Sequence, residues 1–430
     1  MLRLRSGLLR RAMANAQTFR RYVSTAAGSE AILIAAPPRM RVVDLHRPAA
    51  LNALNSEMVA TLLPLVQNWQ QADGDVKLVV FRGAGERAFC AGGDIRFLRE
   101  CSLTGTAEGR APALDFFRGE YSLNHAIGTS RVPIVSLLEG IVMGGGVGLS
   151  VHGHVRVATE STLFAMPETG IGFFPDVGGT YFLPRLRGAL GMYLGLTGAR
   201  LRGRDVLTAG VATHYLPSER IEALEAILLE LAAKTANKAY TLESNQDFVE
   251  PDVLATALAS LEQVGAGAMG ASNAADAEAP PPMLTDEALA EIDEIFGLAD
   301  VGEITEAVNA LAAGVAGAAG AAGAAGASTT PQPPHWAVGA ARELARASPT
   351  SLAVTHAALK RGKQCSSLAE CLQMEFRMAQ RFLRHPDMAS GIGAVLSKGA
   401  DRAVWAPPPT VAEVDEFFAA GEGGELVLES

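Results

Sequence analysis

FAMPETGIGFFPDVGG, residues 164–179, is the stretch that decides how the rest of this chain is interpreted. It places two carboxylates, Glu168 and Asp176, eight residues apart in an otherwise apolar run. Removing a carboxylate from water is costly unless the group is paired, hydrogen-bonded or protonated. Two of them here predict a site that uses their charge, because two acids suffice for proton transfer or for activating water. The alternative is that they cap helices or bind loop amides, as Asp before an apolar helix often does.

Two glycine-rich turns favour the interpretation as a site. AFCAGGD, residues 88–94, follows the strand-like residues 76–81, and MGGGVGL, residues 143–149, follows the strand-like residues 132–138. Glycine lets the backbone pass close to a ligand, and a helix that begins at such a turn leaves amide N–H groups available. Two turns of this kind can offer two amides to one oxygen atom, which is the arrangement of an oxyanion hole.

At these motifs the chain resembles the crotonase (enoyl-CoA hydratase/isomerase) superfamily and, within it, the 3-hydroxyisobutyryl-CoA hydrolase family. The resemblance runs from about residue 40 to residue 217 and resumes more weakly over residues 348–405. It includes HRP at residues 46–48 and FFRGEY at residues 116–121. The glycine turns alone indicate only the superfamily, whereas the run from Met166 to Gly179 is much more specific.

The resemblance implies an α/β fold, namely a crotonase-like spiral of ββα units with a C-terminal helical region. The order of strand-like and helical segments supports by itself only the α/β class. We divide the chain into an organelle transit peptide (1–29), the spiral core (30–260), a variable segment that ends in an Ala/Gly/Pro-rich linker (261–334) and the C-terminal helical region (335–430). For part of the linker, the alternative is a marginal alanine-rich helix broken by glycine.

Hydrophobic periodicity predicts the individual elements. The strands are expected at 31–36, 40–45, 76–81, 132–138, 155–158 and 163–166. The helices are expected at 56–71, from 94, at 114–127, from 144, at 352–360 and at 368–383. Asn55 or Ser56 is the expected N-cap of the first helix, since both residue types accept bonds from free helix amides.

The resemblance also implies a role for each candidate site residue. The N–H groups of Gly93 and Gly145 correspond to the oxyanion-hole donors, and Glu168 and Asp176 correspond to the catalytic pair. Glu120 would contact the acyl part of the substrate, as would Gly145 and the two acids. For Glu120, the alternative is an exposed helix residue without a function.

Departures from the hydratase pattern imply hydrolysis. Hydratases of this superfamily carry a glutamate where this chain has Gly148, and they typically carry glycine where it has Asp176. The implied reaction is cleavage of a short-chain acyl-CoA thioester, 3-hydroxyisobutyryl-CoA, in valine catabolism. The alternatives are an enoyl-CoA hydratase or isomerase activity and a non-catalytic crotonase-fold subunit of a mitochondrial assembly. No metal and no cofactor besides the CoA of the substrate is expected.

Composition and the amino terminus bear on location and partners. The first 29 residues contain six arginines and no acid, which is typical of a mitochondrial transit peptide. The alternatives are a chloroplast address or a basic arm that binds nucleic acid. Without those arginines the net charge falls from −10 to −16, which disfavours nucleic-acid binding by the remaining chain. We expect a matrix protein that binds no membrane and can form a homo-oligomer, with CoA phosphates meeting cations among Arg47, Arg96, Arg185, Lys360, Arg361 and Lys363.

Overall fold

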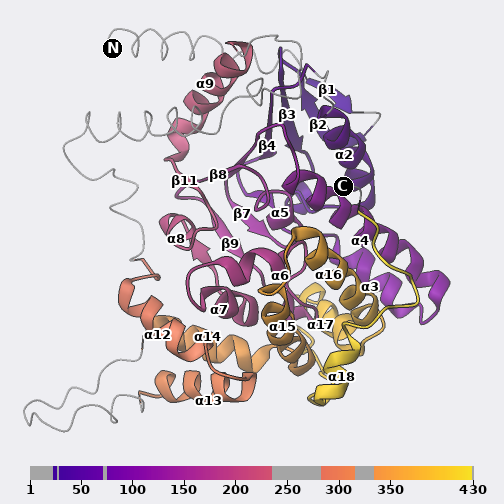
Figure 1. Cartoon of the computed structure of the whole chain (residues 1–430), viewed down its shortest axis with the longest axis vertical. Coiled ribbons are helices and arrows are strands. Elements are labelled where there is room, and N and C mark those ends of the chain that lie inside the picture. The colour runs from indigo at the N-terminus through magenta and orange to yellow at the C-terminus, as the bar shows by residue number, and fades with distance from the viewer. Residues whose placement is uncertain (1–22, 27–28, 71–74, 235–281, 315–333, 429–430) are drawn as a thin grey trace, which may run out of the picture. The chain divides into compact units, whose positions relative to one another are not determined.

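The computed structural model describes residues 23–26, 29–70, 75–234, 282–314 and 334–428. They form two units that alternate along the chain (Figure 1). Among the described residues, the first unit takes those between 23 and 93, 119–164 and 202–234, and the second takes 94–118, 165–201 and those between 282 and 428. The predicted transit peptide up to residue 22, and the linker over residues 315–333, lie outside the described residues.

A seven-stranded sheet forms the framework of the first unit, in the order β1-β2-β3-β4-β6-β8-β11 (Figure 1). Its strands are β1 (Val23–Ala26), β2 (Ser29–Ala35), β3 (Met40–Leu45), β4 (Leu78–Gly83), β6 (Ile134–Leu138), β8 (Val155–Ala158) and β11 (His214–Tyr215). The first three pair antiparallel, and the strands from β3 to β11 pair parallel. The predicted α/β class is confirmed.

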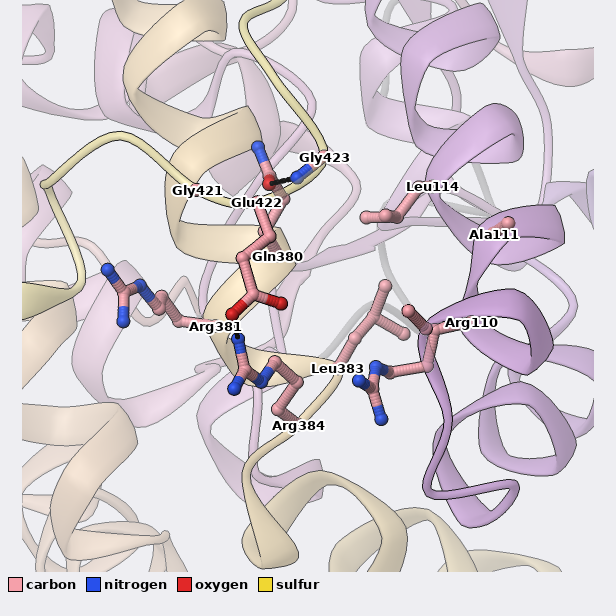
Figure 2. Close-up of a pocket in the computed structure, with 11 residues that line it drawn as sticks. Arg110, Ala111, Leu114, Gln380, Arg381, Leu383, Arg384, Gly421, Glu422 and Gly423 are labelled. Atoms are coloured by element: carbon pink, nitrogen blue, oxygen red, sulfur yellow. Dashed lines mark hydrogen bonds and ion pairs between the residues drawn. The ribbon is translucent and has the colours of Figure 1, made fainter.

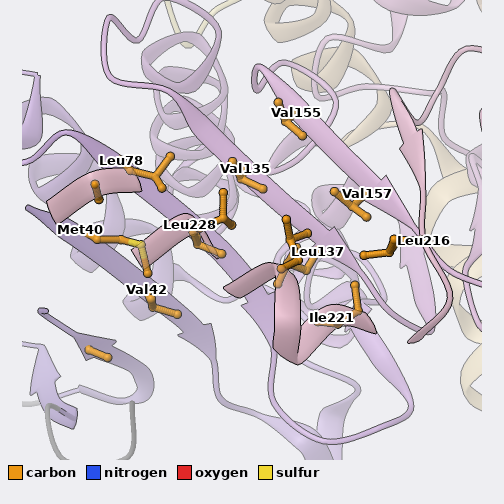
Figure 3. Close-up of a cluster of buried hydrophobic side chains, with 14 residues drawn as sticks. Met40, Val42, Leu78, Val135, Leu137, Val155, Val157, Leu216, Ile221 and Leu228 are labelled. Atoms are coloured by element: carbon orange, nitrogen blue, oxygen red, sulfur yellow. The ribbon is translucent and has the colours of Figure 1, made fainter. Parts of the chain in front are cut away.

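Alternate residues of these strands face helix α9 (Ile221–Lys234) and form the core of the first unit. Figure 3 shows Ile221 and Leu228 of α9 beside Val135 and Leu137 of β6. All five residues of β6 are buried, as expected for a parallel strand covered on both faces. Burial of each such aliphatic side chain contributes about 1.5–3 kcal/mol, so this cluster holds α9 against the seven-stranded sheet.

A second sheet, in the order β10-β9-β7-β5, positions the two turns. Its strands are β5 (Ala88–Cys90), β7 (Ile141–Met143), β9 (Leu163–Ala165) and β10 (Leu201–Arg202). β5 and β7 pair parallel, so their carboxyl ends lie at the same edge. The predicted turns therefore begin side by side.

The remaining helices of the first unit are short, apart from α2. They are η2 (Pro48–Ala50), α2 (Ser56–Trp69), α5 (Gly145–Gly148), α8 (Arg204–Thr208) and η5 (Ser218–Arg220). Asn55 caps α2 by accepting from the Met58 amide, as predicted. Helix α4 (Ala107–Gly128) runs through both units and begins seven residues before the predicted start. The prediction stopped short of Pro112, which the helix accommodates in its second turn.

The second unit is helical. It contains α3 (Ile95–Leu103), η3 (Glu168–Ile171), α6 (Gly179–Phe182), η4 (Leu183–Arg185), α7 (Leu190–Thr197), α12 (Asp286–Phe296), α13 (Val301–Ala312), α14 (His335–Arg346), α15 (Pro349–Gly362), α16 (Leu368–Phe382), α17 (Pro386–Leu396) and α18 (Val411–Glu416). Helices α15 and α16 contact α6, and α17 contacts η3 and α3. The predicted C-terminal helical region is confirmed. Over the described ranges, no helix combines the length and the hydropathy that crossing a bilayer requires.

Candidate functional site

The two glycine turns meet in the first unit. An ideal Cβ on Gly145 would lie 3.5 Å from the Gly92 carbonyl carbon, and the Gly92 carbonyl accepts a 2.8 Å bond from the Leu54 amide. Gly92 has φ +118°, a conformation that glycine adopts readily. The Gly145 amide is the first N–H of α5, and such a group has no partner within its own helix. This turn can therefore offer an amide to a ligand.

Glu120 lies beside the second turn. Its side chain, on α4, is 2% exposed, so the alternative of an exposed helix residue is wrong. Its Oε1 lies 2.6 Å from the position that a Cβ on Gly145 would occupy. Only a glycine leaves room here between the carboxylate and the backbone. The structure thus brings Gly93, Gly145 and Glu120 together in one unit, as a site for a carbonyl oxygen and an acyl group requires.

Glu168 is a buried acid at the start of η3 in the second unit. Glu168 is 6% exposed. Its Oε2 is buried and accepts no hydrogen bond within the described part of the chain. The N-cap position of η3 is Pro167, so Glu168 does not cap this helix. Burial raises the pKa of Glu168 well above its ordinary value, and the charge of Asp176 raises it further. A carboxyl group with a raised pKa is suited to accept and return a proton near neutral pH.

Asp176 is equally buried, at 6% exposure, and lies within electrostatic reach of Glu168. The loop that follows it leads into α6, whose N-cap is Gly178 rather than Asp176. Neither acid therefore occupies an N-cap position. The structure brings these two predicted catalytic residues together in the second unit.

Aromatic side chains anchor the chain between the two acids. Phe173 stacks on Phe117 with ring centroids 5.6 Å apart, and both Phe173 and Phe174 contact Phe382 at 5.4 Å. The predicted apolar surroundings are therefore real. They shield residues 172–176 from solvent, although Gly170 is exposed, and such apolar surroundings strengthen the interaction between the two charges.

Several cations predicted to meet CoA phosphates already have partners inside the chain. Arg47 donates to the Ala53 carbonyl at 2.6 Å, and Lys360 donates to the Ala299 carbonyl at 2.6 Å. Arg185 lies over the Tyr181 ring at 3.8 Å. A phosphate would have to compete with these contacts, so the structure does not single out any of them as the CoA ligand.

A cavity of about 200 Å³ lies in the second unit between the start of α4 and the end of α16 (Figure 2). Figure 2 shows Arg110 and Leu114 of α4 facing Leu383 and Arg384 across it. Arg384 pairs with Glu422 at 3.1 Å. None of the predicted catalytic or oxyanion-hole residues lines this cavity.

Glu375 of α16 is a buried acid that interacts with Asp176, and it is absent from the residues predicted from the sequence. It is fully buried, and burial raises its pKa to about 8 although three hydrogen bonds oppose the rise. The Asp176 charge contributes to the same shift. Helical spacing was the available signal, because Cys371, Leu372 and Ala379, three or four residues away, place Glu375 on the apolar face.

We expect Glu375 to make the stability of the fold fall as pH rises from about 4.5 to about 8. In this window the folded chain retains the Glu375 proton, whereas the unfolded chain, with an ordinary pKa of 4.5, has released it. The free energy of unfolding should therefore fall by a few kcal/mol more in the wild type than in Glu375→Gln, since one pKa unit corresponds to about 1.4 kcal/mol. Urea denaturation of both proteins at pH 5 and pH 8.5 measures this. Parallel changes in the two proteins would contradict the expectation.

Comparison with known proteins bears on what these residues do. The enoyl-CoA hydratase/isomerase family model matches residues 40–420. A Danio rerio protein named 3-hydroxyisobutyryl-CoA hydrolase, mitochondrial, is 41% identical over 92% of this chain and 90% of its own length. A Neurospora crassa protein named small ribosomal subunit protein mS47 is 39% identical over 91% of this chain and 71% of its own length.

Solved structures support the same assignment. A carnitinyl-CoA dehydratase from Mycobacterium thermoresistibile is 32% identical, with a TM-score of 0.72 over 93% of this chain and 99% of that one. The predicted crotonase-like fold is thereby confirmed. Because the family model spans both glycine turns, Glu120 and the two buried acids, this chain belongs to the enoyl-CoA hydratase/isomerase family.

Proposed function

We propose that this protein hydrolyses the thioester of 3-hydroxyisobutyryl-CoA to 3-hydroxyisobutyrate and CoA, a step of valine catabolism. The observation that carries the proposal is the buried pair Glu168 and Asp176 in a chain that has Gly148 where hydratases of the family carry an acid. The relative named 3-hydroxyisobutyryl-CoA hydrolase supports it.

Each residue has a role in the proposed reaction. The amides of Gly93 and Gly145 stabilise the negative charge that develops on the thioester oxygen, and loss of one such donor typically costs about 3–4 kcal/mol. Glu168 acts at the carbonyl carbon, either as a base that takes a proton from water or as a nucleophile that forms an anhydride. Asp176 orients the reacting group and handles the proton for the departing thiolate. Glu120 contacts the acyl part, and no cofactor besides the CoA of the substrate takes part.

Bond changes are the same by either route. The C–S bond breaks, the CoA sulfur leaves and takes up a proton, and an oxygen that comes from water ends in the carboxylate product. By the anhydride route, that water attacks in a second step and regenerates Glu168. The raised pKa of Glu168 suits the base route, in which the group takes up and returns a proton, whereas the anhydride route requires its ionised carboxylate.

Release of free thiol from a panel of acyl-CoA thioesters tests the proposal. We expect the purified chain to act fastest on 3-hydroxyisobutyryl-CoA, and to act on 3-hydroxypropionyl-CoA as well. Isobutyryl-CoA, which lacks only the hydroxyl group, should show a kcat/KM at least about tenfold lower, because a site built for a hydroxyl leaves polar groups unpaired without it. Thiol release no faster than that of Glu168→Gln, or equal rates across the panel, would contradict the proposal.

A mitochondrial matrix location is part of the same proposal. The Arg-rich residues before about Ser24 would direct import and then be removed. The Danio rerio relative, whose name includes mitochondrial, supports this location. Strand β1 begins at Val23 and pairs with β2, so removal of residues 1–22 would leave the sheet complete, whereas removal of all 29 residues of the predicted transit peptide would take β1 away. Mature protein that retains Met1, or a fusion that stays in the cytosol, would contradict it.

The relative named small ribosomal subunit protein mS47 favours a second candidate function, a component of the small ribosomal subunit. It differs from the first in one observable way, because a ribosomal subunit sediments with the particle whether or not it cleaves thioesters. Sedimentation of a mitochondrial extract separates the two functions. Recovery of the chain with small subunits at high salt would support the second function, and recovery only in the soluble fraction would exclude it.

A further inference from the structure

The loop that carries Asp176 has an unusual backbone. Val177 has φ +52° and Gly178 has φ +83°, so two successive residues lie in the left-handed region. For a β-branched residue such as Val177 this conformation is strained, at about 1–3 kcal/mol, and it persists only where the surroundings hold it. Something outside the loop must therefore fix it.

Glu375 of α16 is the group that holds this loop. Its Oε2 accepts a 2.7 Å bond from the Gly178 amide. Its Oε1 accepts bonds from the Thr180 amide at 2.8 Å and from the Thr180 hydroxyl at 2.6 Å. The carboxyl group thus joins two amides of one loop, those of Gly178 and Thr180, through one oxygen each, immediately after Asp176. A side chain with one oxygen cannot reproduce this arrangement.

Helix α15 supports the same loop from its other end. A Cβ on Gly362 would lie 1.9 Å from the Thr180 carbonyl oxygen, so the α15 backbone lies directly on the loop. Within the loop, the Gly179 amide donates to the Asp176 carbonyl at 2.7 Å. Backbone position at Asp176 is consequently set by contacts with two C-terminal helices nearly two hundred residues further along the chain.

Charge links Glu375 to Asp176 as well. The pKa of Glu375 is raised chiefly by burial, and the Asp176 carboxylate adds to the rise, so the two groups interact electrostatically. Burial of an acid with three hydrogen bonds is expensive in free energy compared with an apolar residue of similar volume. If Glu375 served only to pack α16 against α6, an apolar residue of similar volume would stabilise the fold more.

We propose that Glu375 is a positioning residue for the reaction: it holds the loop of residues 176–180 in its left-handed conformation and thereby fixes the carboxylate of Asp176 without touching the substrate. This inference rests on the hydrolase function proposed above. It assigns to α16 a part in catalysis that goes beyond covering the fold.

Glu375→Gln is the first test. The single oxygen of Gln cannot accept from both the Gly178 and the Thr180 amides, so the loop should loosen. We expect kcat for 3-hydroxyisobutyryl-CoA to fall at least about tenfold while KM changes less than about threefold. Hydrogen exchange at the amides of residues 177–180 should become faster, which is a readout independent of activity. The matched control is Glu370→Gln, the same change on the exposed side of α16, and it should leave kcat and loop exchange unchanged.

Thr180→Val and Thr180→Ser separate positioning from folding. The valine removes only the hydroxyl donor to Glu375 at constant shape, and we expect kcat to fall about threefold or more; serine, which restores the hydroxyl, should recover most of it. On an Asp176→Asn background, Glu375→Gln should reduce kcat by less than about twofold, because a residue that acts through Asp176 has little left to position.

Each outcome decides the inference. A folded Glu375→Gln protein with wild-type kcat or unchanged loop exchange overturns the inference. The inference also fails if Glu375→Gln lowers kcat by the same factor in the Asp176→Asn protein as in the wild type. If Glu375→Gln does not fold, wild-type kcat in Thr180→Val overturns it. A wild-type protein that releases no thiol contradicts the proposed hydrolase function instead, and loop exchange then still reports whether Glu375 holds the loop.

Discussion

Glu168→Gln and Asp176→Asn should each lower kcat for thioester hydrolysis by at least about a thousandfold, which corresponds to about 4 kcal/mol of barrier. Both side chains are buried, and each amide nearly preserves the shape while removing the charge. Folding and CoA affinity should therefore survive. Thiol release under saturating substrate measures kcat, and the melting temperature checks the fold.

The double variant tests whether the two acids act on one reacting centre. If they do, it should be little worse than the poorer single variant, because residues that act as a unit are not additive. If a single variant keeps more than about a tenth of the wild-type kcat, its activation barrier has risen by less than about 1.4 kcal/mol. The acid replaced in that variant is then not a principal catalyst. Unfolding of both variants would return these acids to a structural role.

Gly145→Ala should lower kcat/KM at least about a hundredfold, or by about 3 kcal/mol. The added methyl would lie 2.6 Å from Glu120 Oε1 and 3.0 Å from Leu54 Cδ1. The Glu120 carboxylate would have to move, and the methyl would occupy the space beside the proposed oxyanion donor. Steady-state kinetics with 3-hydroxyisobutyryl-CoA measures the loss.

Gly339→Ala is the matched control for the added methyl. Gly339 lies in α14, and an ideal Cβ there meets nothing within 4 Å. The change should leave kcat/KM as it is and stabilise the helix by up to about 1 kcal/mol, because alanine favours a helix more than glycine does. A Gly145→Ala protein as active as this control would show that space beside Glu120 is not used for the substrate.

Local patterns were enough to predict many elements. The ranges Met40–Leu45 and Val155–Ala158 match β3 and β8, because an apolar run bounded by turn residues defines both ends of a short strand. Asn55 marks the start of α2 because capping depends on neighbours three residues away. The glycine turns were expected directly after residues 76–81 and 132–138, but the structure places the three-residue strands β5 and β7 in between, and strands this short leave no periodic signal.

Long-range contacts account for what the sequence did not reveal. The helix expected from residue 144 is only four residues long, since its glycines offer little helix propensity and the chain turns beyond Leu149. Helices α12 and α13 lie in a segment judged by composition alone, and their buried faces become evident only against neighbouring helices. The role of Glu375 depends on partners nearly two hundred residues away in sequence, which no local pattern encodes.

One comparison tests the central claim most directly: the rate of hydrolysis of 3-hydroxyisobutyryl-CoA against the rate of hydration of crotonyl-CoA, measured on one preparation of the purified protein. Hydrolysis is followed by free thiol, and hydration by loss of the enoyl absorbance. With Asp176 present and no carboxylate at Gly148, we predict that hydrolysis is the faster reaction. Hydration as fast as hydrolysis, or faster, would contradict the account.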